Sequence, residues 1–323
     1  MSAESVKRIA VVGAGLMGHG IGLEFAVAGY PVVFHDVTED ALARALQRVE
    51  TDLRELTEWG LMEGAEVEPA LDRIQTTTVL EEAASEADLV LEAVFEDLSL
   101  KQEVFAKLDA VCPERTILAS NSSSLMPSML AEATRRPDRV LVAHYFYPPP
   151  LMPLVEIVRS ESTSDKVVDT VYEVMKAIGK RPIIVQKEAL GFIVNRLQMA
   201  LDREALSLVQ RGIATAQDVD IATWNSFGRR LAVVGPLQLF EFQDGWDVAV
   251  QIFNYICPDI EHSPSPPQVM LDLAERGDLG PKTGKGFYEW DSGSAKAFER
   301  KLKEALAAFL RADREDGKGS KAE

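Results

Sequence analysis

Cysteine and histidine are scarce in this 323-residue sequence, which contains two cysteines and four histidines. Cys112 and Cys257 lie far apart, and neither belongs to a CxxC or CxxH pattern. The chain therefore has neither a disulfide framework nor the ligand spacing of a zinc site, and we expect no metal. Two thiols without such a pattern are typical of a reducing compartment, so we expect a cytoplasmic protein.

Positive charge is also in short supply. The chain has 34 Lys and Arg against 51 Asp and Glu, which gives a formal net charge of −17. A surface this acidic repels phosphate backbones and anionic lipid, so nucleic acid and membranes are poor partners. The longest apolar runs, such as Leu231–Val234, are far shorter than the roughly 18 residues of a membrane-spanning helix. We therefore expect a small-molecule substrate.

The remaining composition is that of an ordinary globular protein, and 323 residues predict two domains. Short β-branched runs alternate with longer helical patterns in the first half. The strands expected from these runs are Ile9–Val12, Pro31–Phe34, Ile74–Thr77, Leu89–Ala93, Thr116–Ser120, Val140–Ala143, Leu154–Val158 and Ile183–Val185. Strands separated by helices form βαβ units, so this half predicts an α/β fold with a Rossmann-type, doubly wound and mainly parallel sheet.

The second half has helical patterns and no strand signals. The helices expected here are Phe192–Gln210, Ala216–Phe227, Trp246–Ile256, Gln268–Arg276 and Ala295–Ala312, the last with Phe298, Leu302, Leu306 and Phe309 on one face. We therefore divide the chain into a Rossmann-type sheet domain (residues 1–188), an all-α C-terminal domain (residues 189–312) and a disordered tail (residues 313–323).

A glycine loop lies between the first strand and the first helix. Its sequence, Gly13-Ala14-Gly15-Leu16-Met17-Gly18, is a GxGxxG in the setting that dinucleotide binding requires. The glycines permit a tight turn, a close approach of backbone N–H groups to a pyrophosphate, and close packing of helix and strand. Asp36 follows the second strand, where its carboxylate can bind both ribose hydroxyls. No arginine follows within residues 37–40 to hold a 2′-phosphate, so this loop and Asp36 predict NAD rather than NADP. A purely structural glycine turn is the alternative.

Polar side chains follow several later strands of the predicted sheet. Glu96 and Lys101 come after one strand, Asn121 and the serines 122–124 after the next, and His144 after the one beyond. In a doubly wound sheet, ligands bind outside the carboxyl ends of the strands. These groups are therefore expected to gather where a nicotinamide ring would lie.

His144 and Glu156 form a candidate acid–base pair. Glu156 interrupts the otherwise apolar stretch 154–158, and an unpaired buried carboxylate is very costly. A histidine partner would meet this need, and the carboxylate would orient the imidazole and stabilise its protonated form for general base catalysis. The alternatives are a core histidine without a catalytic role, and a salt bridge between Glu156 and Arg159.

The same residues appear in fixed order in a known family. The matching segments are the glycine loop, Glu96, Asn121-Ser122-Ser123-Ser124, His144-Tyr145-Phe146-Tyr147-Pro148, Glu156, Gly191-Phe192-Ile193-Val194-Asn195-Arg196 and Lys282-Thr283-Gly284-Lys285-Gly286-Phe287-Tyr288. On these segments the chain resembles the NAD-dependent L-3-hydroxyacyl-CoA dehydrogenase family over about residues 7–292. Seven segments in order are far more specific than any one of them.

The resemblance implies roles for the matching residues. His144 would take the proton of the substrate's 3-hydroxyl while hydride passes to the nicotinamide, and Glu156 would hold the imidazole in its tautomer. Ser123 would hydrogen-bond the reacting oxygen beside the cofactor. Asn195 would help to place the substrate.

Further implications of the resemblance concern the cofactor and the assembly. Glu96 and Lys101 match positions that contact the cofactor, and the helical domain of the family forms a dimer interface, which implies a homodimer. Two positions depart from the family. Tyr147 stands where the family usually has Asn, which puts one polar contact near the nicotinamide in doubt, and Leu190 replaces a usual Pro.

The segments expected to contact the substrate differ more strongly from those of the CoA-specific family members. CoA-specific members carry lysines after the position of Asp36, whereas residues 39–73 here include ten acids, four arginines and no lysine. Such a surface is unfavourable for multiply charged CoA. The segment Gly228-Arg229-Arg230-Leu231-Ala232-Val233-Val234-Gly235-Pro236 is similar to the arginine-bearing segment of the L-gulonate 3-dehydrogenases, the relatives of lambda-crystallin. An arginine at position 230 facing the active site would bind a free carboxylate bidentately. A helix-end arginine in solvent or at a dimer interface is the alternative.

Three functions remain open on this basis. The favoured one is oxidation of a small free 3-hydroxy acid of the gulonate or carnitine kind. The second is a 3-hydroxyacyl-CoA (3-hydroxybutyryl-CoA) dehydrogenase of fatty acid metabolism, with CoA contacts from Arg44, Arg48 and Arg54. The third is a nonenzymatic NAD-binding or crystallin-like structural protein, against which the intact set of site residues argues. A serine hydrolase is excluded because no GxSxG elbow is present and the glycine loop would be unexplained.

Overall fold

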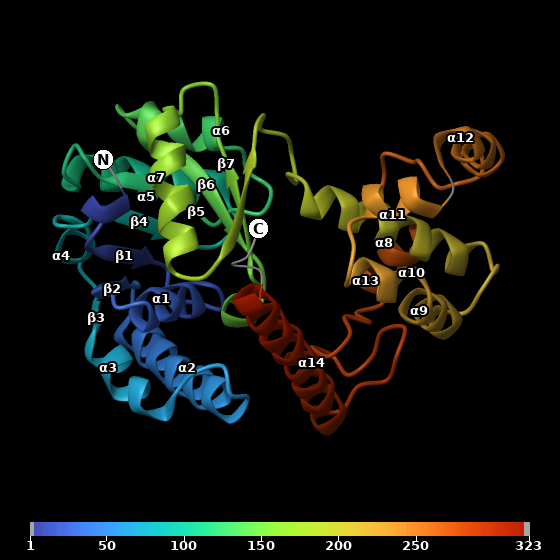
Figure 1. Ribbon diagram of the computed structural model, residues 1–323, viewed down its shortest axis with the longest axis horizontal. Helices are drawn as coiled ribbons and strands as arrows, with labels where there is room; N and C mark the ends of the chain where they lie inside the picture. Colours follow the sequence, from blue (N-terminus) through green and yellow to red (C-terminus); the bar gives the residue numbers. More distant parts are fainter. Residues whose placement is uncertain (1–2, 244, 320–323) are drawn as a thin grey trace. The chain divides into compact units, whose positions relative to one another are not determined.

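The computed structural model describes residues 3–243 and 245–319 and divides into two compact units. The first unit comprises Met1–Asn195 and Glu299–Glu323, and the second comprises Arg196–Phe298. Figure 1 colours them along the chain, with the sheet of the first unit in blue to green. The first unit continues beyond the predicted boundary at residue 188 to Asn195, and the start of the following helix is hydrogen-bonded to a strand of the sheet. The predicted division into domains stays a prediction.

The first unit is built on an eight-stranded sheet with the order β3-β2-β1-β4-β5-β6-β7-β8. The strands are β1 (Ile9–Val12), β2 (Val32–His35), β3 (Ile74–Thr77), β4 (Leu89–Glu92), β5 (Ile117–Ser120), β6 (Val140–Tyr145), β7 (Leu154–Val158) and β8 (Arg181–Val185). All neighbours pair in parallel except β6 and β7, which are antiparallel. All eight predicted strands are present, and the mainly parallel, doubly wound sheet is confirmed.

Helices cover both faces of this sheet. They are α1 (Gly18–Val27), α2 (Glu39–Glu58), α3 (Val67–Asp72), α4 (Leu80–Ala84), α5 (Leu98–Val111), α6 (Pro127–Ala131) and α7 (Asp165–Ala177). One core cluster joins alternate side chains of the strands to α1, α2 and α7, and another joins the opposite side chains to α5 and α6. The central strand β1 is buried along its whole length, as expected of a parallel strand covered on both faces.

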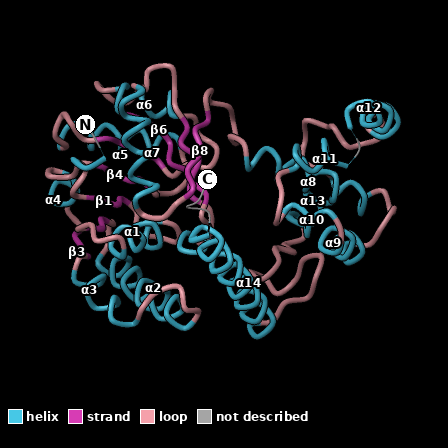
Figure 2. Tube along the Cα trace, in the orientation of Figure 1, coloured by secondary structure: helices cyan, strands magenta, loops and turns pink. Residues whose placement is uncertain are grey.

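Helices and loops make up the second unit, as Figure 2 shows by the absence of magenta over its described residues. The helices are α8 (Val194–Gln210), which begins in the first unit, and α9 (Ala216–Asn225), α10 (Phe227–Leu231), α11 (Pro236–Gln243), α12 (Gly245–Ile256) and α13 (Gln268–Glu275). The all-α character predicted for this half is therefore confirmed. The short helices α10 and α11 were not expected, because Gly228, Gly235 and Pro236 interrupt the helical pattern.

The C-terminal helix α14 (Ser292–Gly319) differs from the sequence expectation in two ways. Its C-terminal part belongs to the first unit, where Ala307 is buried and Leu306 and Leu310 pack against the core. Phe298 and Phe309, expected on the buried face, are more than half exposed. Residues 313–319, expected to be disordered, continue the helix, and residues 320–323 lie outside the described part of the chain. Within the described residues, no helix is long and apolar enough to cross a membrane.

Candidate active site

The glycine loop joins β1 to α1 with the spacing that a dinucleotide requires. Gly13 has a φ of 93°, and a Cβ there would lie 2.7 Å from the backbone of Ala93. A Cβ on Gly18 would lie 1.8 Å from the carbonyl oxygen of Gly13. Only glycine fits at these two positions. A Cβ on Gly15, in contrast, would meet nothing within 4 Å, which leaves room for a pyrophosphate beside the loop.

A cavity of about 860 Å³ opens at the carboxyl ends of the strands. Its lining includes the predicted cofactor and catalytic residues Gly13, Gly15, Leu16, Met17, Asp36, Glu96, Lys101, Ser123 and His144. Asp36 accepts hydrogen bonds from Ala14 N at 3.0 Å and Val37 N at 2.8 Å, so its carboxylate is held at the end of β2 beside the loop. The glycine loop, the fixed carboxylate and the open cavity fit NAD, which would supply the hydride acceptor.

His144 and Glu156 are paired within this edge of the sheet. His144 Nδ1 lies 2.8 Å from Glu156 Oε2, and both side chains are buried. They face each other because β6 and β7 run antiparallel with these two residues in register. The sequence placed His144 just after its strand, but β6 continues to Tyr145 and includes it. The alternative partner Arg159 instead pairs with Asp165 at 2.5 Å.

The second oxygen of Glu156 is bound to the backbone. Glu156 Oε1 accepts hydrogen bonds from the N–H groups of Ile193 and Val194, each at 3.0 Å. These groups lie at the start of α8, where the helix dipole favours a negative charge. Phe192, at a φ of 51°, precedes them and packs its ring 5.6 Å from the ring of His144. The Gly191–Asn195 segment therefore fixes the carboxylate, a function that the sequence did not indicate.

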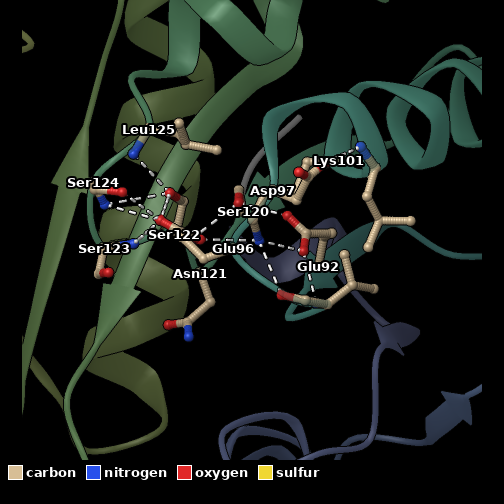
Figure 3. Close-up of polar contacts among 12 residues, drawn as sticks. Glu92, Glu96, Asp97, Lys101, Ser120, Asn121, Ser122, Ser123, Ser124 and Leu125 are labelled. Carbon is tan, nitrogen blue, oxygen red and sulfur yellow. Dashed lines mark hydrogen bonds and ion pairs between the residues drawn. The ribbon is translucent and has the colours of Figure 1, made fainter. Parts of the chain in front are cut away.

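The loop that carries Ser123 is organised by Glu96. Glu96 Oε1 accepts from Ser122 Oγ at 2.6 Å, from the backbone N–H groups of Ser123 and Ser124 at 3.1 Å, and from Ser124 Oγ at 2.8 Å. In Figure 3, the carboxylate of Glu96 points toward these serines. Burial raises the pKa of Glu96, but the serine hydrogen bonds and the charge of Lys101 outweigh it, so the pKa lies below its ordinary value. No described residue hydrogen-bonds Ser123 Oγ, which remains available to a ligand.

Lys101 is held by a carboxylate that the sequence analysis missed. Its Nζ lies 2.7 Å from Glu92 Oε1 and 3.4 Å from Glu96 Oε2, and its side chain is only 1% exposed. Glu92, at the end of β4, also accepts from Ser120 Oγ at 2.6 Å (Figure 3). The only available signal was a carboxylate within an apolar strand, the same signal that identified Glu156. The predicted contacts of Glu96 and Lys101 with NAD stay predictions; within the protein, both support the loop of Ser123.

Asn195 and Tyr147 also contact the described site. Asn195 Nδ2 donates to the carbonyl oxygen of Ser123 at 2.9 Å, so it ties the start of α8 to the serine loop. Tyr147 lines the cavity in place of the family's usual Asn, and its hydroxyl donates to Glu299 Oε1 at 3.1 Å. Leu190, which replaces the usual Pro, is exposed before Gly191.

Arg230 belongs to the second unit. It lies on α10, and its Nη1 donates to Gln243 Oε1 at 3.2 Å. Its predicted contact with a substrate carboxylate stays a prediction. Within residues 3–243 and 245–319, no group of three or more His, Cys, Asp or Glu side chains could hold a metal ion.

Comparison with known proteins agrees with this geometry. The profile of the 3-hydroxyacyl-CoA dehydrogenase NAD binding domain matches residues 8–189, and that of the 3-hydroxyacyl-CoA dehydrogenase C-terminal domain matches residues 191–290. Human mitochondrial hydroxyacyl-coenzyme A dehydrogenase is 37% identical over 299 residues, covering 88% of this chain and 91% of that one. L-carnitine dehydrogenase of Streptomyces coelicolor is 37% identical over 260 residues, covering 80% of each chain.

A third relative has a similar structure. The 5-formyl-3-hydroxy-2-methylpyridine 4-carboxylate 5-dehydrogenase of Mesorhizobium japonicum is 29% identical over 306 residues, covering 95% of this chain and 98% of that one. A crystal structure of an enzyme of this name, described as an NAD⁺-dependent dismutase, superimposes with a TM-score of 0.89. Together with the glycine loop and the two matched domains, these relatives show that the chain is an NAD-dependent oxidoreductase belonging to the 3-hydroxyacyl-CoA dehydrogenase family.

Proposed function

We propose that this enzyme oxidises the 3-hydroxyl of a small free 3-hydroxy acid, of the gulonate or carnitine kind, with His144 as general base. The observation that carries the proposal is the buried His144–Glu156 pair at the edge of the cofactor cavity. A neutral imidazole that donates through Nδ1 to a carboxylate has its Nε2 free to accept a proton.

Each residue of the pair has a distinct task in this proposal. Glu156 accepts from Nδ1, which holds the imidazole in the tautomer with an unprotonated Nε2. Nε2 takes the proton of the 3-hydroxyl, and the Glu156 carboxylate stabilises the imidazolium that forms. The hydroxyl of Ser123 hydrogen-bonds the reacting oxygen. Bound NAD supplies the acceptor for the hydride.

The preference for a free acid rests on charge and on the relatives. The α2 region, residues 39–73, is acidic and has no lysine to meet CoA phosphates. L-carnitine dehydrogenase and the pyridine 4-carboxylate dehydrogenase are named for substrates without CoA. Arg230 is the carboxylate partner predicted from the sequence.

A second candidate is 3-hydroxyacyl-CoA oxidation in fatty acid metabolism. The match to human mitochondrial hydroxyacyl-coenzyme A dehydrogenase over 88% of the chain favours it. The nonenzymatic alternative has no such support, because the chain belongs to an oxidoreductase family and keeps Ser123, His144 and Glu156.

NADH oxidation distinguishes the two candidates. The purified enzyme is assayed with acetoacetyl-CoA and, in parallel, with a panel of free 3-oxo acids. Our proposal predicts a higher kcat/KM for at least one free acid than for the thioester. Faster turnover of acetoacetyl-CoA would overturn the substrate assignment and leave the roles of NAD, His144 and Glu156 untouched.

The assembly and location stay proposals as well. We propose a homodimer formed through the helical unit, where Phe242 and Tyr255 are 88% and 85% exposed. Light scattering would contradict the dimer if it gave the mass of one chain. The cytoplasm, inferred from cysteine usage, is testable by fractionation of the source cells.

A further inference from the structure

The side chain of His19 ties the glycine loop to helix α2. His19 lies in the first turn of α1, directly after the last glycine of the loop, and its side chain is only 7% exposed. Its Nδ1 lies 2.7 Å from the carbonyl oxygen of Gly15, and its Nε2 lies 3.1 Å from Asp52 Oδ2. Helices α1 and α2 lie side by side in the first unit (Figure 1). The imidazole therefore connects two segments that are distant in the sequence.

Both partners of this imidazole are hydrogen-bond acceptors. A backbone carbonyl oxygen and an ionised carboxylate have no proton to donate. A neutral imidazole carries a single N–H, so it can donate to one of these partners and turns a lone pair toward the other. The imidazolium donates from both nitrogens. A proton placed on Asp52 instead is disfavoured, because a carboxyl group is a much stronger acid than an imidazolium. The two contacts therefore fit a positively charged His19.

The carbonyl group that His19 contacts belongs to the loop that fits the pyrophosphate. The Gly15–Leu16 peptide is trans, so its C=O and N–H groups point in opposite directions. A charge-assisted hydrogen bond to the oxygen fixes this peptide and polarises it, which makes its N–H a stronger donor. Gly15 and Leu16 line the cofactor cavity, and no described residue accepts a hydrogen bond from the Leu16 N–H. That N–H group is therefore available to a phosphate oxygen.

The charges around the ring make its protonation state important. His19 and Asp52 line a cavity of about 420 Å³, through which the ring can exchange protons with solvent. The other titratable side chains on this cavity are Arg44 and Arg48 of α2, Tyr147 of the segment after β6, and Glu299 and Lys303 of α14. Lys303 is balanced by Glu55 at 2.9 Å and Glu299 at 3.7 Å.

The carboxylate of Asp52 depends on His19 for its neutralisation. Among the residues that the structure describes, His19 is its only hydrogen-bond or ion-pair partner. When the ring loses its proton, the net charge of the pair changes from zero to −1. The change occurs beside a loop that has to receive two phosphate charges, and the Asp52 side chain, at 18% exposed, is only partly screened by water.

We propose that His19, as an imidazolium paired with Asp52, is a positioning residue for the pyrophosphate of NAD, and that the affinity for the dinucleotide falls when the ring loses its proton. Imidazoles exchange this proton near neutral pH. The protonated ring holds the Gly15 carbonyl and balances Asp52. The neutral ring gives up one of the two hydrogen bonds and leaves a carboxylate that repels the diphosphate. This inference goes beyond the proposed function, because it concerns the cofactor and holds for either candidate substrate.

Cofactor binding and protonation are thermodynamically linked in this proposal. If the protonated form binds NADH more tightly, NADH binding takes up protons, and the slope of log Kd against pH gives their number. Kd is measured by NADH fluorescence from about pH 6 to about pH 8.5. Proton uptake is measured by calorimetry in two buffers that differ in ionisation enthalpy. For the wild type, we expect Kd to rise about tenfold over this range, with net proton uptake.

His19→Asn removes the titration and keeps a donor to Gly15, because an amide nitrogen takes the place of Nδ1. Its Kd for NADH should be constant with pH and about tenfold above that of the wild type at the acid end, and its proton uptake should vanish. A merely structural role would instead raise Kd equally at every pH. His262→Asn, which changes an exposed histidine of the second unit, is the matched control and should follow the wild-type curve.

Asp52→Asn leaves the histidine in place and removes its carboxylate partner. The variant loses both the counter-charge that favours the imidazolium and the negative charge that remains when the proton leaves. The rise of Kd with pH should therefore be smaller than in the wild type. Glu50→Gln, exposed on the same helix and outside the cavity, removes one negative charge elsewhere and should keep the wild-type rise.

The outcomes decide the proposal as follows. A Kd that rises with pH in the wild type and is constant in His19→Asn supports it. An equal rise in both proteins assigns the effect to another group, such as His35 or His144 of the cofactor cavity, and overturns it. A Kd independent of pH in the wild type overturns it as well.

Asp52→Asn decides alone if His19→Asn does not fold. A reduced rise of Kd then supports the proposal, and a rise equal to that of the wild type contradicts it. None of these titrations contains an oxo acid or a thioester, so failure of this inference leaves the proposed function standing, and the reverse also holds.

Discussion

The carboxylate of Glu156 joins the imidazole of His144 to the first backbone N–H groups of α8. One oxygen lies 2.8 Å from the imidazole, and the other accepts two backbone hydrogen bonds at the start of α8. A buried carboxylate with both oxygens bonded in this way is satisfied and cannot swing away from the histidine. The antiparallel pairing of β6 and β7 therefore places the proposed general base, His144, in register with the carboxylate proposed to orient it.

Glu156→Gln tests this link. The amide keeps the shape and can still accept from the start of α8, but it cannot stabilise an imidazolium as a carboxylate does. We expect kcat to fall at least about tenfold with little change in the Kd of NAD. The pH profile of kcat is the decisive readout, because a purely structural role would lower activity without moving it. Asp165→Asn, which removes an exposed ion pair, is the control.

Asp36→Ala tests the cofactor preference. The carboxylate is fixed by Ala14 N and Val37 N at the end of β2, where a ribose would lie. Its removal should weaken NAD and reduce the discrimination against NADP, since the acid no longer repels a 2′-phosphate. Steady-state kinetics with both cofactors measure this. A cofactor preference equal to that of the wild type would remove Asp36 from the ribose site.

Glu96→Gln tests the support of the serine loop. The substitution weakens four hydrogen bonds to one oxygen and removes the counter-charge near Lys101. We expect kcat/KM to fall about tenfold, because Ser123 loses its fixed position. Glu81→Gln, exposed on α4, should behave like the wild type. Full activity in Glu96→Gln would show that the loop is held without this charge.

The buried carboxyl group of Glu24 should make the stability of the folded chain depend on pH. Burial raises its pKa to about 7, against the opposing effect of its ion pair with Lys180. Between the ordinary value of 4.5 and about 7, the folded chain holds a proton that the unfolded chain releases. The contribution of Glu24 to stability is therefore greatest below pH 4.5 and declines as the pH rises to about 7.

Urea unfolding of the wild type and of Glu24→Gln at several pH values measures this contribution. From pH 4.5 to pH 7, the free energy of unfolding of the wild type should fall relative to that of Glu24→Gln by on the order of 3 kcal/mol. Parallel pH curves for the two proteins would contradict the raised pKa.

Much of the fold followed from local pattern. Strands such as Ile9–Val12 and Leu154–Val158 were predicted to the residue because β-branched runs between turn signals have few alternatives. Glu156 was found because a lone acid in an apolar strand demands a partner. The same logic would have found Glu92, whose partners Lys101 and Ser120 are distant in sequence.

Other features depend on tertiary contacts, which the hydrophobic pattern of the sequence does not indicate. The apolar face expected for α14 includes Phe298 and Phe309, yet the helix buries Ala307 instead, because Lys303 and Arg314 anchor a different side to the first unit. A cavity of about 420 Å³ is lined by residues of α1, α2, α14 and the Tyr147 segment together, so no single stretch of sequence indicates it.

The most direct test of the account is single-turnover oxidation of NADH by His144→Ala with the best oxo substrate. The account predicts a rate lowered by about 10²–10⁴ and a Kd for NADH equal to that of the wild type, because the base is lost while the cofactor cavity is intact. A rate near that of the wild type would contradict the assignment of His144 as the acid–base residue.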